Sequence, residues 1–241
     1  MLDFENLMCY TYFVKTKQRE KAMEEKIFEE LIYLISYPEN FNENEKYPLV
    51  VFLHGRGARS ATTEKLHQYS SLKHLKSRQN ERGYILLAPH CARGDWNEWM
   101  MLLVRLLEKM RELPYVDKTR VYITGNSMGG YGTWELCLLH AEWFAAAMPL
   151  CGGGIGGMAG QAGELPIRAF HGLLDKTVDP IESLQMAKAI NTAGGHAELI
   201  LYPELAHNCW DTVYTDEKNY DWLFSFTTER DKELTRKLSL N

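Results

Sequence analysis

The 241-residue chain is poor in the features that bind metals or nucleic acids. Its five cysteines are scattered and odd in number, and none shows the CxxC spacing typical of zinc or dithiol sites. No stretch of lysine and arginine is interleaved with aromatics, and the formal charge is −5. Binding to a phosphate backbone is therefore not expected. We predict no metal, no cofactor and no nucleic-acid partner.

Neither an export signal nor a membrane span is expected from the sequence. Asp3 and Glu5 stand where a secretory signal has basic residues before an apolar core, so a cytoplasmic location is expected. One uncharged stretch, residues 143–163, has the length of a bilayer span but holds seven glycines and Pro149. This composition predicts a strand followed by a glycine-rich loop. No association with membranes is expected.

The composition, with 45% hydrophobic and 24% charged residues, is that of an ordinary globular protein. Single α/β domains often reach ~200–250 residues, so the length fits one large domain or two small ones. No internal repeat or low-complexity linker divides the chain. We predict one domain over residues 1–241, with a core over about 31–225 and a charged C-terminal tail over 227–241.

Short apolar runs bounded by turn residues alternate with segments of helical spacing. The runs predict strands at 49–53, 84–88, 120–124, 145–150, 166–170 and 198–202, after an N-terminal pair at 8–15 and 31–37 that flanks a charged stretch. Helices are predicted at 64–77, 101–113, 129–140, 180–193 and 220–226. This alternation predicts an α/β fold, with a mostly parallel twisted sheet of about eight strands and helices on both faces.

The strongest local motif is G-x-S-x-G, centred on Ser127 between a predicted strand and a predicted helix. In this context the motif is typical of a nucleophile held on a sharp turn. Gly125 and Gly129 leave space where a side chain would collide with neighbouring backbone. Ser127 is therefore expected at the carboxyl edge of the sheet, where open α/β folds bind ligands.

A serine nucleophile needs a histidine base, which a carboxylate orients. After an elbow of this kind the chain order is serine, acid, histidine. His196 opens the last predicted strand and is expected at the amino edge of the sheet, opposite Ser127. His207 follows the same strand and is expected at the carboxyl edge, so we predict His207 as the general base.

Two aspartates follow the strand predicted at 166–170. Asp179 precedes Pro180 and stands three positions before Glu182, which is the pattern of a helix N-cap with a capping box. Asp175 has no such structural explanation. We therefore predict that Asp175 is the acid that orients His207.

Acyl transfer also requires backbone N–H groups directed at the developing oxyanion. Met128, directly after the nucleophile, is one predicted donor, and the glycine-containing loop at 54–57 supplies the other. In that loop Arg56 is the first choice and Gly57 the alternative.

Three tryptophans are candidates for substrate contact, together with Gly57. Trp96 and Trp99 lie in a predicted loop after the strand at 84–88, and Trp210 lies three residues beyond His207. Aromatic side chains at one sheet edge can form an acyl or alcohol pocket. The alternative is that these side chains are large and half-buried for structural reasons.

Five segments together resemble the α/β-hydrolase serine carboxylesterases: VVFLHGRGARS, APHCARGDW, RVYITGNSMGG, AFHGLLDKTVDP and YPELAHNCWDTVY. The group includes predicted peptidases, phospholipase/carboxylesterases, and enzymes that are feruloyl-esterase-like or polyhydroxybutyrate-depolymerase-like. The resemblance covers about residues 31–225. It implies an α/β-hydrolase fold and the triad Ser127, Asp175 and His207.

The sequence departs from this family at two positions. The oxyanion loop of the family usually reads HGxGE or HGxGD. In this chain Ala58 and Arg59 replace the acidic residue, so the role of that carboxylate does not carry over. Asn208 replaces the aspartate that often follows the histidine, which leaves the triad intact.

The sequence therefore predicts a serine carboxylesterase (EC 3.1.1.-) that acts through an acyl-enzyme on small-molecule esters. Short-chain or aromatic acyl groups are expected, including feruloyl or acetyl esters from plant cell-wall material. A serine peptidase acting on short peptides is the alternative among enzymes, and a non-catalytic binding module on a hydrolase scaffold is the alternative from another class. The oligomeric state stays open, and a homodimer is compatible with such a domain.

Access to the site can also be predicted. Residues 152–165 number only 14, seven of them glycine, which is too few for a lid domain. A bare core fold is expected, in which any cover over the site comes from the loop around Trp96 and from this glycine-rich segment.

Overall fold

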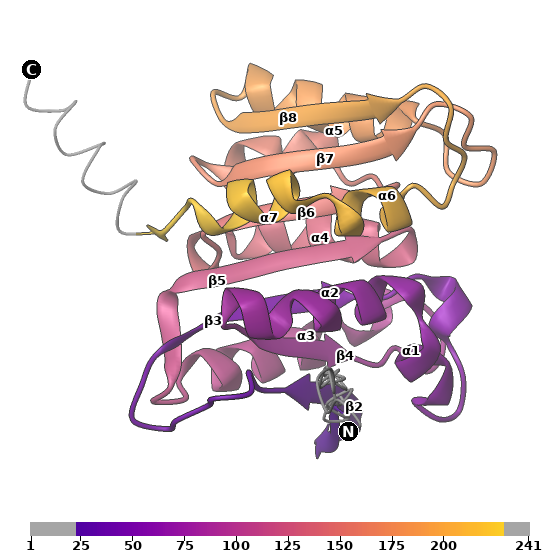
Figure 1. Ribbon diagram of the computed structural model, residues 1–241. Helices are drawn as coiled ribbons and strands as arrows, with labels where there is room; N and C mark the ends of the chain where they lie inside the picture. Colours follow the sequence, from indigo (N-terminus) through magenta and orange to yellow (C-terminus); the bar gives the residue numbers. More distant parts are fainter. Residues whose placement is uncertain (1–22, 229–241) are drawn as a thin grey trace, which may run out of the picture.

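The structure, a computed structural model, describes residues 23–228 and contains one eight-stranded sheet (Figure 1). The strand order is β1-β2-β4-β3-β5-β6-β7-β8. The strands from β4 to β8 in this order run parallel, whereas β2 pairs antiparallel with both β1 and β4. Their bounds are β1 Glu24–Phe28, β2 Leu31–Ser36, β3 Tyr47–Leu53, β4 Ile85–Pro89, β5 Val116–Asn126, β6 Ala146–Leu150, β7 Pro166–Gly172 and β8 His196–Tyr202.

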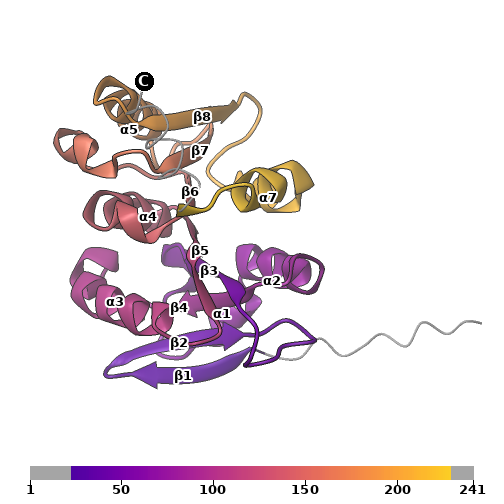
Figure 2. The ribbon, with the colours of Figure 1, turned by 90° about the vertical axis from the view of Figure 1, so that its left-hand side faces the viewer.

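Helices cover both faces of the sheet, with α3, α4 and α5 on one face and α2 and α7 on the other (Figure 2). The α-helices are α1 Glu64–Gln68, α2 Ser70–Arg82, α3 Trp96–Arg111, α4 Met128–Leu139, α5 Ile181–Thr192, α6 Trp210–Thr215 and α7 Glu217–Phe224. The 3-10 helices are η1 Arg56–Ala58, η2 Ala141–Trp143 and η3 Gly156–Ala162. Within residues 23–228, no helix is both long enough and apolar enough to cross a bilayer.

The central strand β3 shows why continuous apolar runs predicted the sheet. Val50 and Phe52 belong to the core under α2, α6 and α7, while Val51 and Leu53 belong to the core under α3, α4 and α5. Because successive side chains point to opposite faces, a strand covered on both faces must be apolar at every position. The six strands predicted between residues 49 and 202 are confirmed with small shifts of their ends.

The N-terminal strands differ in part from the prediction. The strand predicted at 31–37 corresponds to β2, whereas residues 8–15 lie outside the described residues. The observed partner of β2 is β1, which falls within the stretch interpreted only as charged. β1 is an edge strand with a largely exposed surface, so charged residues are tolerated there and no apolar run marks it.

The helical boundaries also needed correction. The helix predicted at 64–77 is divided at Tyr69 into α1 and α2. α3 begins at Trp96, because the Asp95 side chain accepts a hydrogen bond of 3.0 Å from the Asn97 N–H and caps the helix. α6 was not predicted. The predicted tail at 227–241 lies, from residue 229 onward, outside the described residues.

Candidate active site

Ser127 stands on a sharp turn between β5 and α4. Its backbone has φ 58° and ψ −120°, a conformation that side chains rarely adopt, and its N–H donates to the Leu150 carbonyl at 2.9 Å. A Cβ on Gly129 would lie 1.8 Å from the Leu53 carbonyl oxygen, and one on Gly125 would lie 2.5 Å from the Gly129 oxygen. The predicted steric reason for both glycines is confirmed, and the turn fixes the position of Ser127.

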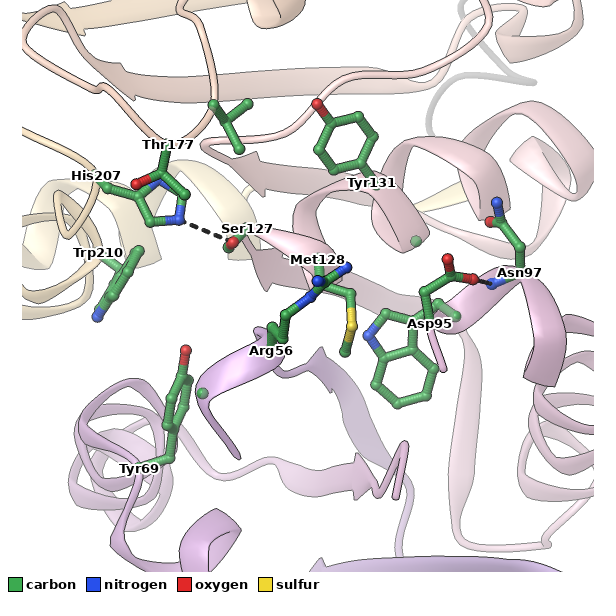
Figure 3. A pocket seen from close by; sticks show the side chains of 14 residues that line it. Arg56, Tyr69, Asp95, Asn97, Ser127, Met128, Tyr131, Thr177, His207 and Trp210 are labelled. Carbon is green, nitrogen blue, oxygen red and sulfur yellow. Dashed lines mark hydrogen bonds between the residues drawn. The ribbon is translucent and has the colours of Figure 1, made fainter. Parts of the chain in front are cut away.

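The structure brings Ser127, His207 and Asp175 together from three separate loops (Figure 3). The Ser127 Oγ lies 2.8 Å from the His207 Nε2, and the His207 Nδ1 lies 2.6 Å from the Asp175 Oδ2. Because the carboxylate is an acceptor, Nδ1 carries the proton and Nε2 is free to accept the serine proton. This is the arrangement that activates a serine nucleophile.

The Asp175 side chain is fully buried and remains ionised. Burial by itself raises its pKa, but hydrogen bonds from His207 and from the Val178 and Thr177 amides outweigh this effect, so the pKa of Asp175 lies below its usual value. The two backbone N–H groups reach Oδ1, at 3.0 Å from Val178 and 2.8 Å from Thr177. Asp175 can therefore stabilise a positive charge on His207 without becoming protonated.

A second histidine, which sequence reasoning did not assign, also contacts Asp175. The buried His171 Nε2 lies 3.1 Å from the Asp175 Oδ2 and 3.0 Å from the Val178 carbonyl oxygen. Because both partners are acceptors, Nε2 must carry a proton and donate it. The His171 Nδ1 lies 2.8 Å from the Ser183 hydroxyl. The Asp175 carboxylate is thus held between two imidazole rings.

The alternative acid and base lie elsewhere and have other partners. Asp179 accepts a hydrogen bond of 3.0 Å from the Ile181 N–H at the start of α5, a capping contact of the kind that the Asp179–Pro180 pattern predicted. His196 opens β8, is exposed, and pairs with Glu164 at 3.0 Å. The structure brings neither residue to Ser127.

A cavity of about 820 Å³ opens over Ser127. Arg56, Gly57 and Met128 line it, as predicted for the oxyanion loop and the start of α4, while the direction of their N–H groups stays a prediction. The remaining lining residues come from several loops and helices: Tyr69, Asp95, Trp96, Asn97, Tyr131, Gly132, Thr177, Val178, His207 and Trp210.

The three tryptophans have different positions. Trp210 lines the cavity edge-on to His207, with ring centroids 5.3 Å apart. Trp96 also lines it, but it is almost fully buried in α3 and donates to the His54 carbonyl at 3.1 Å. Trp99 does not line this cavity: its side chain packs into the core and donates to the Arg93 carbonyl at 2.9 Å, which favours the structural alternative. The prediction that Trp96 and Trp99 lie in a loop is wrong.

The oxyanion loop is supported by residues whose role the sequence did not indicate. The buried His54 accepts a hydrogen bond of 3.0 Å from the Cys91 N–H at Nε2, so its Nδ1 donates to the Gly55 carbonyl at 2.8 Å. Burial lowers the pKa of His54 to about 4, which keeps the ring neutral. Arg59 stands in the part of the loop where the related family usually has an acidic residue. Its side chain donates a hydrogen bond to the Gly94 carbonyl at 2.5 Å. These bonds fix the loop against the segment before α3.

Tyr69 was not predicted to line the cavity, and the glycine-rich segment lies elsewhere than expected. Tyr69 lines the cavity and its hydroxyl accepts a hydrogen bond of 2.9 Å from the Asn126 side chain, but no motif marks it. Residues 152–165 were expected to cover the site, yet none of them lines this cavity. They contain η3, and Gly152 packs so closely on α4 that its Cβ would lie 2.6 Å from the Gly130 backbone.

Residues 95–221 match the dienelactone hydrolase family. The chain is 26% identical over 147 residues to a probable feruloyl esterase C from Aspergillus flavus, a match that covers 59% of this chain and 54% of that protein. It is 24% identical over 221 residues to dipeptidyl-peptidase 5 from Porphyromonas gingivalis, covering 70% of this chain and 32% of that protein. The chain thus spans about half the length of the feruloyl esterase relative.

Among solved structures, the crystal structure of a thermostable esterase matches with a TM-score of 0.78 and 27% identity. The match covers 86% of this chain and 63% of that one. Together with the sheet order, this likeness confirms the predicted α/β-hydrolase fold.

Proposed function

The chain belongs to the dienelactone hydrolase family, and on that premise we propose that it is a serine hydrolase of small-molecule carboxylic esters. The observation that carries this proposal is the continuous hydrogen-bonded path from the Ser127 Oγ through His207 to the buried Asp175 carboxylate, with steps of 2.8 and 2.6 Å. Ser127 lines a large cavity, through which an ester carbonyl can reach the serine hydroxyl.

The proposed reaction has two steps. In the first, His207 takes the Ser127 proton as the oxygen attacks the ester carbonyl, and the Met128 and Arg56 N–H groups hold the oxyanion. The intermediate collapses to an acyl-serine while His207 returns the proton to the departing alcohol. In the second step, His207 activates water, which releases the acid and restores Ser127. Neither step calls for a metal or cofactor.

The proposed substrates are esters with short-chain or aromatic acyl groups. The volume of the cavity, with Tyr131 on the side of Ser127 away from His207, leaves room for planar or apolar acyl groups. The name of the feruloyl esterase relative supports aromatic acids from plant cell walls.

A serine peptidase is the second candidate, supported by the dipeptidyl-peptidase relative. An amine is a poorer leaving group than an alcohol and needs full protonation by His207 as it departs. Parallel assays of p-nitrophenyl esters and dipeptide p-nitroanilides discriminate the two. The proposal expects ester hydrolysis to dominate, and a higher kcat/KM on the anilides would favour the peptidase.

The direct test is hydrolysis of p-nitrophenyl acetate and butyrate by the wild type and by Ser127→Ala. Wild-type turnover that disappears in the variant is expected. Equal rates would remove Ser127 from the mechanism, and no turnover by either protein would favour the binding module.

The cytoplasmic location and a homodimer remain part of the proposal. Cell fractionation and the mass in solution measured by light scattering test them.

A further inference from the structure

A second cavity of about 310 Å³ runs along the exposed side of α4. Four residues of α4 line it, and the last three follow Tyr131 by four, seven and eight positions. This spacing places their side chains on one face of the helix. The helical wall consists of Tyr131, Glu135, Leu138 and Leu139, and the facing wall of Gly153, Gly154, Ile155 and Met158. Leu139 is 41% and Ile155 65% exposed, so two large apolar side chains face solvent here.

This second cavity adjoins the catalytic cavity, because Asn97 and Tyr131 line both. The Tyr131 N–H donates to the Ser127 carbonyl at 3.1 Å, one helical turn from the nucleophile. At a rise of 1.5 Å per residue, Tyr131 lies about 6 Å and Leu139 about 18 Å along the helix from Ser127. The groove therefore begins beside the nucleophile and leads away from it.

The two sides of Ser127 have different chemical roles. His207 must protonate the departing alcohol, so the alcohol leaves on the side of His207 and Trp210. In Figure 3, Tyr131 and Asn97 lie on the other side of Ser127. The acyl group is therefore the part of the ester that points toward the second cavity.

We propose that the second cavity is an extension of the acyl site, which binds the far end of an extended, apolar, uncharged acyl chain. This proposal rests on the proposed ester hydrolysis. Leu138, Leu139, Ile155 and Met158 supply an apolar lining beside the polar Asn97 and Glu135, and this lining favours hydrocarbon over water. Burial and the neighbouring Asp95 carboxylate raise the pKa of Glu135. A second negative charge at the end of the acyl chain is disfavoured for the same reasons.

The test compares p-nitrophenyl octanoate with p-nitrophenyl acetate, which share a leaving group. Leu139→Asp places a charge at the far end of the groove. The matched control is Leu184→Asp, because Leu184 is 46% exposed on α5 and lines neither cavity. The ratio of kcat/KM for octanoate to that for acetate is expected to fall about tenfold in Leu139→Asp and less than twofold in the control.

The results separate the acyl extension from the ester hydrolysis on which it rests. An unchanged ratio in a folded Leu139→Asp overturns the acyl extension while leaving the ester hydrolase standing, whereas a wild type that hydrolyses neither ester overturns both. Should Leu139→Asp fail to fold, Ile155→Asp on the facing wall carries the same expectation.

A charged probe provides an independent readout. The mono-p-nitrophenyl ester of octanedioic acid ends in a carboxylate, and we expect its kcat/KM to be about tenfold below that of octanoate. Glu135→Gln should recover part of this loss by removing the like charge. Equal rates on the two esters would contradict the proposal.

Discussion

The two ends of β8 carry histidines with very different surroundings. At the amino end, the His196 side chain is 68% exposed and pairs with an equally exposed Glu164. Beyond the carboxyl end, the His207 side chain is 21% exposed and lies between Ser127 and a carboxylate with no exposed surface. One strand thus separates a solvated ion pair from a candidate catalytic base.

The edge of the sheet at which a histidine lies, and not the residue type, decides whether it can act as the base. The carboxyl edge collects the loops after β5, β7 and β8, so a nucleophile, an acid and a base converge there. At the amino edge the exposed His196 pairs with the exposed Glu164 carboxylate, and a pairing of this kind contributes little to stability.

The largest expected effect comes from exchanging each histidine for glutamine. His207→Gln should lower kcat/KM for p-nitrophenyl acetate by about 10⁵-fold or more, because the serine loses its base. His196→Gln should stay within about twofold of the wild type. Comparable losses in both variants would break the contrast between the two ends of the strand.

A second contrast involves the two aspartates after β7. Asp175→Asn should lower kcat by about 10⁴-fold, because an amide cannot hold His207 in the required tautomer. Asp179→Ala should leave the rate within about twofold and lower the free energy of unfolding by about 1 kcal/mol through loss of the α5 cap. Kinetics and urea unfolding on both variants test this division, and a rate loss confined to Asp179→Ala would reverse our assignment.

A smaller effect is expected at His171, which positions Asp175. His171→Leu should lower kcat about tenfold and move the acidic limb of the pH profile of kcat/KM to higher pH. The cause is that a carboxylate lacking one donor stabilises protonated His207 more strongly. His171→Gln, whose amide can donate from a similar position, should restore both. If His171→Leu lowers the melting temperature but leaves the acidic limb of the pH profile unchanged, the role of His171 is packing alone.

The smallest effect concerns stability and pH. The pKa of Asp175 is lower in the folded than in the unfolded chain, so its contribution is fully present above the unfolded value of about 3.9 and is lost as pH falls through the folded pKa. The difference in free energy of unfolding between wild type and Asp175→Asn should therefore narrow as pH is lowered from 6 toward 3. Urea titrations at several pH values measure it, and a widening difference would contradict the ionised assignment.

The fold and the three central residues could be predicted because each signal is local. Short runs rich in apolar residues mark β5, β7 and β8, and Ser127, Asp175 and His207 each stand shortly after one of these strands. The order serine, acid, histidine, together with their positions after the carboxyl ends of these strands, is enough to place the three residues at the carboxyl edge of the sheet.

Other features depend on contacts between distant segments. From the sequence, Trp99 was expected in a loop beside the pocket. Because Asp95 caps α3, the helix already includes Trp99, whose side chain packs into the core. Tyr69 reaches the cavity from the junction of α1 and α2, and no pattern in its neighbours indicates this. β1 was missed because an exposed edge strand needs no apolar run.

Covalent labelling shows whether Ser127 is the activated nucleophile. A fluorophosphonate reacts with a serine only when the base and the oxyanion donors are in place, so intact-mass and peptide analysis report the assembled site. We predict one adduct per chain, on Ser127, absent in Ser127→Ala and formed far more slowly in His207→Gln. Esterase activity that persists with no adduct on Ser127 would contradict the account.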